Sequence, residues 1–334
     1  MSAASDSLDQ QRVRPGDVVS AWVRNNGWAL GLIGFLAILL VFTKIILPTY
    51  GAPGVQGLAI SVLPLALAAV AQAIVVISGG IDLSIGSMMA VTSSLSAVWM
   101  RGQSEEMSIV IVLGVILIGL LLGVINGTLV VLTRVPDIVV TLAMLFVWAG
   151  VALLVLRTPG GESADWLRNL VLGSIGNEWI PKAGVVLLLV VGIIWLPIRR
   201  SKLGLSLYAV GSNSLAAFRS GVSVSRTKVI AYMLTGLFSA LAGISLTAST
   251  GIGLPVPGDY TLLSVAAVVL GGVSLAGGRG GVLGPIIGVV ILALLRNDMA
   301  FLRINTHYAT VAQGMILVGV VMVGTLIQLR RSRS

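Results

Sequence analysis

Apolar residues in this chain form long runs separated by short polar connections, which is the pattern of a polytopic membrane protein. Most runs approach the length of about 17 to 25 residues that a helix needs to cross a bilayer. Unpaired backbone groups are not tolerated in hydrocarbon, so each run is predicted to be helical. We expect an all-α bundle of about ten transmembrane helices, over residues 28–47, 57–77, 84–99, 108–132, 138–156, 183–198, 229–249, 263–277, 281–295 and 309–328.

Two of these runs, 263–277 and 281–295, are short for a bilayer. A helix rises 1.5 Å per residue, so each would reach only about 22 Å of the roughly 30 Å hydrocarbon core. They are predicted to be tilted, broken or partly re-entrant. The expected count therefore lies between about eight and eleven spans.

Composition agrees with a membrane location. Hydrophobic residues make up 57% of the 334 positions, charged residues make up 10%, and the mean hydropathy is +1.05. Soluble domains carry about 25% charged residues, so this chain could not cover a water-facing surface. The formal net charge of +9 would suggest a nucleic-acid partner in a soluble protein. Here the basic residues follow membrane topology instead, and no nucleic acid is expected.

Lys and Arg set the predicted orientation, because they accumulate in cytoplasmic loops. With the N-terminus in the cytoplasm of a bacterial inner membrane, fourteen of the 21 basic residues fall on the inner side, and both termini are cytoplasmic. Residues 199–228 hold six basic residues and no acid. We expect a cytoplasmic segment at 1–27, a transmembrane domain at 28–328 with a cytoplasmic loop at 199–228, and a cytoplasmic tail at 329–334.

Several absences exclude other functions. The chain has no cysteine and no apparent nucleophile–base or carboxylate pair, so no enzyme activity, metal or cofactor is expected. None of its four lysines follows Gly and precedes Ser or Thr, so the chain lacks a phosphate-binding P-loop and cannot be an ATPase itself. Ionisable residues are also scarce in the apolar runs. This disfavours an ion-coupled secondary carrier, although that remains an alternative, and indicates that a partner supplies the energy.

The most distinctive stretch follows the second apolar run and contains Gly79, Gly80 and Asp82. The glycine pair can break the helix, and Asp82 can cap the next one by accepting from the amides of Ser84 and Ile85. Two readings stay open, a capped structural turn or a place on the route of a solute.

From this stretch onward the chain resembles the permease subunits of bacterial ATP-binding-cassette importers for monosaccharides, of the ribose, arabinose and xylose type. The resemblance covers nearly the whole chain after residue 57, and its motifs occur in the expected order. They are Ser78-Gly79-Gly80-Ile81-Asp82-Leu83-Ser84-Ile85-Gly86, Gly123-Val124-Ile125-Asn126-Gly127, Arg134-Val135-Pro136-Asp137-Ile138-Val139-Val140-Thr141-Leu142, Gly204 to Val222, and Ala266 to Gly280.

The chain departs from the family pattern at two places. It has Pro136-Asp137-Ile138 where the family often has a second proline, and Ser214-Leu215 where the family often has Arg-Glu. The missing acid changes the detail expected for the contact with the ATPase.

The resemblance implies a transmembrane subunit that moves a monosaccharide delivered by a periplasmic binding protein. Implied partners are ATP-binding-cassette ATPase subunits, a second permease subunit that is identical or related, and membrane lipid. A branched-chain amino acid permease of the same broad fold is the nearer alternative, disfavoured by the Gly-Gly-Ile-Asp-Leu-Ser stretch.

Within the loop 199–228, Ser212 or Asn213 can cap a short helix from Leu215 to Arg219, and Gly221 can end it. Leu215 and Phe218 then share one face with Arg219. The resemblance identifies this helix with the coupling helix that contacts the ATPase; the spacing alone also fits a helix on the lipid surface. The residues expected to couple the two subunits are Gly211, Ser212, Asn213, Leu215, Ala216, Phe218, Arg219 and Gly221.

Small residues recur at helical spacing and predict closely packed helices, because lipid provides no hydrophobic drive for association. Two such series are 119–123–127 and 280–284–288, all glycines. Polar residues inside such a bundle are candidates for the solute path. We expect this path to involve Gln72, Asp82 and Asn126.

Overall fold

The computed structural model describes residues 15–256 and 258–304, with single residues at 308, 311, 314, 315, 318, 319 and 322. Most of the predicted last span, 309–328, lies outside the described residues, as do the chain ends 1–14 and 329–334.

The described part is helical, with one small antiparallel hairpin. The helices are α1 (Pro15–Ile46), α2 (Ala52–Ile77), α3 (Ile85–Met100), α4 (Glu105–Thr133), α5 (Asp137–Val155), α6 (Asp165–Val171), α7 (Lys182–Val190), α8 (Leu196–Arg200), α9 (Lys202–Ser212), α10 (Ser214–Arg219), α11 (Val224–Thr250), α12 (Tyr260–Leu270) and α13 (Leu283–Phe301). The hairpin pairs β1 (Ser174–Ile175) with β2 (Asn177–Pro181), and a π-helical turn, Val191–Trp195, joins α7 to α8.

Each of the first nine predicted apolar segments overlaps a helix, and 183–198 spans α7, the π-helical turn and α8. Seven helices in the described part are long and apolar enough to cross a membrane, counting 182–200 as one, and α3 and α12 are shorter. The expectation of a polytopic helical bundle is therefore confirmed. The prediction of ten spans remains open, because the tenth segment is not described.

Helices α2 and α11 form the centre of the bundle. Both are largely buried, and α11 packs against α2, α3 and α4. A helix that is apolar on all sides, as α2 is, is expected in such a position. At the periphery, α4 turns large apolar side chains outward, including Leu113, Leu117 and Leu121. These are the side chains that a lipid-facing surface needs.

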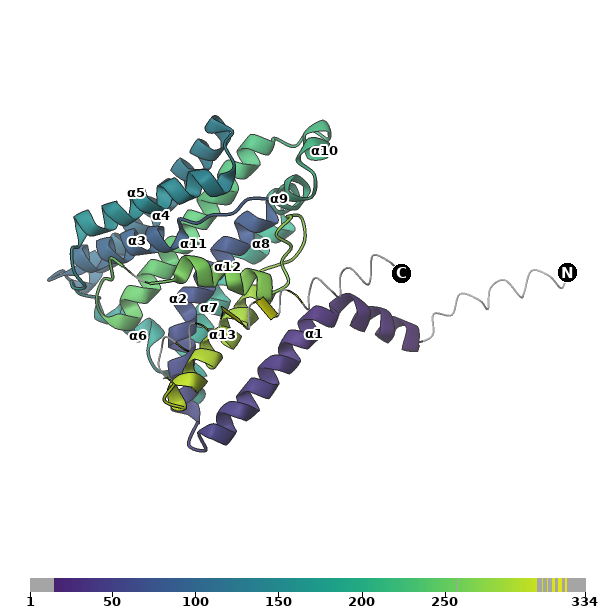
Figure 1. Ribbon diagram of the computed structural model, residues 1–334. Coiled ribbons are helices and arrows are strands. Elements are labelled where there is room, and N and C mark those ends of the chain that lie inside the picture. The colour runs from purple at the N-terminus through teal and green to yellow at the C-terminus, as the bar shows by residue number, and fades with distance from the viewer. Residues whose placement is uncertain are drawn as a thin grey trace.

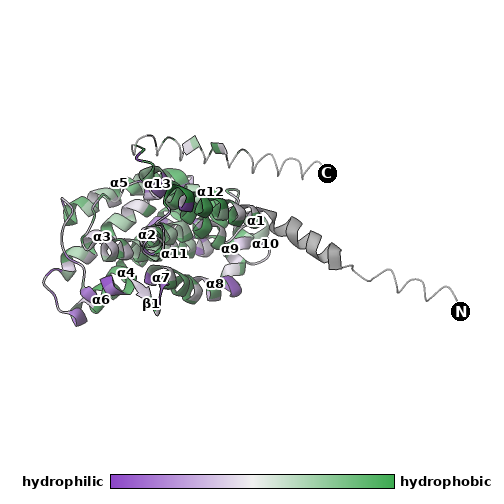
Figure 2. Cartoon of the chain, turned by 90° about the horizontal axis from the view of Figure 1, so that it is seen from below, coloured by the Kyte–Doolittle hydropathy of each residue, from purple (hydrophilic) through white to green (hydrophobic). Residues whose placement is uncertain are grey.

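The bundle has two distinct ends, which both views show (Figures 1 and 2). Helices α8, α9 and α10 lie at one end, which we call the α10 end, and α6 lies at the other, which we call the α6 end. Figure 2 shows hydrophilic residues at α6 and near α8, with apolar helices between them. This distribution is expected for a bundle whose middle is embedded in lipid.

Glycine packing agrees with the predicted small-residue series. A Cβ at Gly123 would overlap the Tyr232 carbonyl oxygen in α11, and one at Gly127 would lie 2.9 Å from the Tyr232 Cβ. In α13, a Cβ at Gly288 would lie 2.8 Å from the Ala267 carbonyl oxygen in α12. These glycines let the helix backbones meet closely, so the packing prediction is confirmed.

The predicted edges of the last two described spans were wrong. The run 263–277 is helical only as far as Leu270, because Gly271-Gly272 turns the chain with a φ of +75° at Gly272. Conversely, α13 continues beyond 295 to Phe301, although Arg296, Asn297 and Asp298 are polar. The hydropathy pattern predicted too early an end for this span, because it does not distinguish polar side chains that face a cavity or a partner helix from those of a loop.

Replacing Gly123 with Leu should destabilise the protein, because the added side chain would force α4 away from α11. Overpacking of this kind costs about 1–3 kcal/mol. The matched control is Gly114→Leu on the same helix, where an added Cβ meets nothing within 4 Å. Thermal unfolding in detergent should show a lower Tm for Gly123→Leu alone. Equal Tm values would contradict the close packing of α4 on α11.

Candidate functional site

The turn between α2 and α3 is held by its own side chains. Asp82 Oδ1 accepts hydrogen bonds from the backbone amide of Ser84 at 2.8 Å and from its hydroxyl at 2.6 Å. The predicted capping by Asp82 is thus found at Ser84, whereas no bond from the Ile85 amide is formed in the described structure. Asp82 is fully buried. The carboxylate therefore fixes the start of α3.

Asn126 joins this turn to two further helices. Its side-chain amide donates to the Ser84 hydroxyl at 2.7 Å, and its carbonyl accepts from Trp148 Nε1 at 3.1 Å. Asn126 is also fully buried. The contacts favour a bracing role for Asp82 and Asn126, and their place on a solute path stays a prediction.

The start of α5 is tied to the same turn. Asp137 forms an ion pair with Lys228 of α11 at 3.3 Å and accepts from the Tyr232 hydroxyl at 3.1 Å. Thr141 accepts from the Leu83 amide at 3.1 Å. The motif at 134–142 thus anchors α5 and α11 to the turn at 78–84.

Three backbone segments meet at the glycine of this turn. The Gly278 amide donates to the Ile77 carbonyl at 2.9 Å, and a Cβ at Gly277 would lie 2.9 Å from the Gly79 Cα and 2.7 Å from the Gly211 oxygen. Gly211 has no room for a side chain, because a Cβ would overlap the Ile77 oxygen. We call the assembly of residues 77–84, 126, 137–141, 211–212, 228–232 and 277–280 the hub.

Tyr208 of α9 adds a side-chain link, because its hydroxyl donates to the Gly280 carbonyl at 2.8 Å. Burial raises the pKa of Tyr208 above the ordinary value for tyrosine, while the charge of Arg199 opposes this shift. The hydroxyl is thus kept as a donor at neutral pH. All five motifs quoted from the sequence therefore converge on one region at the α10 end.

Helix α10 projects from the hub as a short capped element. Asn213 accepts from the Ala216 amide at 2.9 Å, as an N-cap does, and Gly221 takes a left-handed φ of +85°. The predicted cap and stop are thus confirmed. Leu215 is 58% exposed, Phe218 is 67% exposed, and Arg219 is exposed beside them. Of the predicted coupling residues, Gly211 and Ser212 lie in the hub, and the others belong to α10 or flank it.

Gln72 lies on α2 between the hub and the α6 end, and it is fully buried. Neither its side-chain oxygen nor its nitrogen has a hydrogen-bond partner among the described residues. A buried polar group without a partner costs about 1–3 kcal/mol. This conformation therefore leaves Gln72 in an unfavourable environment.

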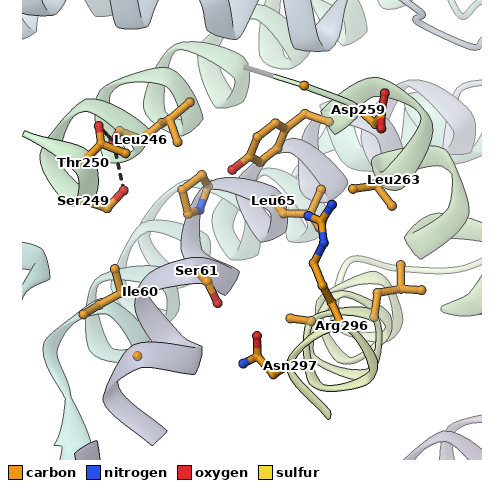
Figure 3. A pocket seen from close by; sticks show the side chains of 16 residues that line it. Ile60, Ser61, Leu65, Leu246, Ser249, Thr250, Asp259, Leu263, Arg296 and Asn297 are labelled. Atoms are coloured by element: carbon orange, nitrogen blue, oxygen red, sulfur yellow. Dashed lines mark hydrogen bonds between the residues drawn. The ribbon is translucent and has the colours of Figure 1, made fainter. Parts of the chain in front are cut away.

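A cavity of about 500 Å³ opens toward the α6 end, between α2, α11, α12 and α13. Arg296, Asn297 and Ser61 line it, and Figure 3 shows their side chains pointing into one space between α2 and α13. Asp259 and Tyr260 contribute from the start of α12. Leucines 65, 246 and 263 supply apolar wall.

Sequence reasoning missed this cavity. Arg296 appeared to be a loop residue beyond the end of a span, and Asp259 a residue of an outer connection. Helix α13 extends to Phe301, so Arg296 lies on a helix at the cavity rather than in a loop, and Asp298 Oδ1 accepts from the Thr43 hydroxyl at 2.8 Å. The polar triplet Arg296-Asn297-Asp298 directly after an apolar helical run was the available signal.

The comparisons with known proteins agree with this architecture. The family described as "Branched-chain amino acid transport system / permease component" matches residues 54–326. The ribose import permease protein RbsC of Bacillus subtilis is 35% identical, over 84% of this chain and 88% of its own length. RbsC of Escherichia coli K12 is 34% identical, over 77% of this chain and 81% of its own length. The xylose transport system permease protein XylH of the same organism is 29% identical, over 86% of this chain and 88% of its own length. No solved structure matches the chain.

A family match over most of the chain, together with relatives covered along most of their length, assigns the chain to a family of transport subunits. The expectation that it is a transport protein rather than an enzyme is confirmed. The helices described above make it a multi-pass protein of the inner membrane. The chain belongs to the permease-component family that matches residues 54–326.

Proposed function

We propose that the chain is the transmembrane subunit of an ATP-binding-cassette importer for a monosaccharide. The observation that carries this proposal is the similarity, along most of the chain, to permeases named for ribose and xylose import. Further relatives are named for D-allose and fructose. The family description names branched-chain amino acids, which remain the second candidate substrate class.

In this proposal the α10 end faces the cytoplasm and the α6 end faces the outside. The exposed basic residues Arg199, Arg200 and Lys202 at the end of α8 and the start of α9 support this orientation, because such residues concentrate on the cytoplasmic side. The N-terminal end of α1 lies toward the same side (Figure 1). Two permease subunits, identical or related, would enclose the solute path, and a periplasmic binding protein would deliver the solute to the α6 end.

Energy would enter through α10. Its exposed Leu215 and Phe218 form an apolar edge outside the lipid-facing middle of the bundle, and Arg219 adds a charge beside them. Aromatic side chains and Arg are enriched at protein interfaces, so Phe218 and Arg219 suit such a contact. We propose that they insert into the ATPase subunit, and that the hub passes its movement to the transmembrane helices.

Reconstitution tests the function directly. The chain, its ATPase and its binding protein in proteoliposomes should import radiolabelled D-ribose, D-xylose, D-allose or D-fructose when ATP is on the ATPase side. L-leucine serves as the comparison substrate. Import of leucine without any of the four sugars would favour the amino acid alternative. Uptake by the lone chain under an ion gradient would overturn the importer assignment.

Replacing Leu215 and Phe218 with Ser should weaken binding of the ATPase. Each large apolar side chain is worth about 1.5–3 kcal/mol when buried, which corresponds to about tenfold or more in affinity per residue. Co-purification with the ATPase measures this loss. The matched control, Leu170→Ser on α6, also removes a half-exposed leucine and should leave co-purification unchanged. Normal ATPase binding by the double variant would contradict the proposed contact.

Replacing Gln72 with Leu should stabilise the described conformation while slowing import. Leu has a similar volume but no amide, so it should stabilise the described conformation by about 1–3 kcal/mol. In an open conformation the Gln72 amide would be hydrated, and Leu would lose that hydration. We expect a higher Tm and a lower rate of uptake. The control is Gln56→Leu, at a partly exposed site on the same helix. Ser61→Ala would not serve as a control, because Ser61 lines the cavity. A raised Tm with unchanged uptake would exclude Gln72 from the path.

A further inference from the structure

We infer that the cavity at the α6 end is the site where a single subunit receives the solute, a neutral polyhydroxylated molecule. This inference rests on the proposed import function. The cavity is built from four helices of one chain, and its volume of about 500 Å³ is within the usual range for small-molecule sites.

The polar groups of the cavity suit hydroxyl groups. Arg296 offers only donors, the exposed Asp259 carboxylate at the rim offers only acceptors, and Asn297 offers both. The Ser61 hydroxyl donates to the Leu58 carbonyl and so offers an acceptor. Figure 3 places Arg296, Asn297 and Ser61 around the same space. No ion pair joins Arg296 to Asp259 within the described residues, so both side chains keep hydrogen-bonding capacity for a solute.

The charged residue lies within a helix rather than beyond its end. Arg296 is followed by five further residues of α13, which places it about 7.5 Å below the helix end along the axis. Its side chain is exposed where it lines the cavity, so a solute that enters the cavity can reach it.

The apolar wall completes the match to a sugar. Leu65, Leu246 and Leu263 line the cavity beside the polar groups. A sugar ring presents hydroxyl groups at its rim and C–H groups on its faces, so it requires both kinds of surface. A binding site with only a few polar groups holds its solute weakly, which suits a carrier that must release it.

The cavity is also placed to respond to the hub. Helix α2 leads from Leu65 at the cavity to Ile77 at the hub, twelve residues or about 18 Å. Helices α12 and α13 are joined by the segment that contains Gly277 and Gly278. Helix α11 also connects the two, because it carries residues 228–232 of the hub and Leu246 of the cavity, so all four walls lead to the hub.

A zwitterionic amino acid is the competing occupant, because its carboxylate could pair with Arg296 and its ammonium group with Asp259. Neutral variants separate the two. Arg296→Gln keeps a donor, whereas Arg296→Leu does not. For a sugar, uptake should fall about tenfold in Arg296→Leu, the effect of one hydrogen bond to a charged group, and Arg296→Gln should recover part of it. Equal loss of uptake in both variants would contradict the inference that the solute is neutral.

Blocking the cavity tests its use. The chain has no cysteine, so Ser61→Cys or Asn297→Cys introduces the one reactive thiol of this subunit. In proteoliposomes of the full complex, a bulky membrane-impermeant maleimide on either thiol should abolish uptake of D-ribose, or of whichever of the four sugars the wild type imports. Gln103→Cys, exposed between α3 and α4 at the same end, is the control, and its labelling should leave uptake unchanged.

The outcomes separate the two proposals. If the unmodified complex imports none of the four sugars, the proposed function fails. If it imports a sugar and continues to do so at the full rate after complete labelling of Ser61→Cys and Asn297→Cys, the cavity proposal alone is overturned. Loss of uptake in labelled Gln103→Cys as well would also overturn it, because the block would then not depend on the cavity.

Discussion

The close approach of three backbones at the hub is the constraint on which the rest of the structure depends. Gly211 of α9 packs against the Ile77 carbonyl, and that carbonyl also accepts the Gly278 amide. No side chain fits between these segments, so α9 cannot shift without moving the end of α2 and the turn that precedes α13. Packed protein interiors are nearly incompressible and transmit such displacements. A force applied to α10 therefore reaches the helices of the bundle through backbone contacts.

Hydrogen bonds and one ion pair surround this contact and determine which helices respond. Asp137 joins α5 to α11 through Lys228 and Tyr232, while Asn126 joins α4 to the turn before α3. Buried polar networks of this kind favour one arrangement over alternatives. Asp82 Oδ2 has no partner among the described residues, but Asp82 Oδ1 has two, whereas neither polar atom of the Gln72 side chain, outside the network on α2, has one. The hub is thus a rigid end, and the section around Gln72 is the part of α2 that gains from rearrangement.

The sequence predicted what depends on local pattern. Apolar runs located nine helices, and the Asn213 cap and the Gly221 stop followed from side-chain chemistry at fixed spacing. It could not predict what depends on tertiary contacts. The polar end of α13 remains helical because Arg296 faces a cavity and Asp298 meets Thr43 on α1, a residue 255 positions away. Likewise, five motifs spread along the chain gave no indication that they meet at a single turn.

The distribution of polar groups also explains how such a bundle can stay closed to its solute. Polar side chains line the cavity near the α6 end and the hub near the α10 end, and between them α2 is buried and apolar except for Gln72. Buried hydroxyl groups on the neighbouring helices, such as those of Thr235 and Thr247, already donate to backbone carbonyls. A hydroxyl group that enters apolar protein without a partner costs about 1–3 kcal/mol on protein scales. A sugar carries several hydroxyl groups, so the middle section opposes its passage strongly while the helices stay packed. Passage then requires that the helices separate, and in the proposed function an ATP-driven partner would apply that force through α10 and the hub.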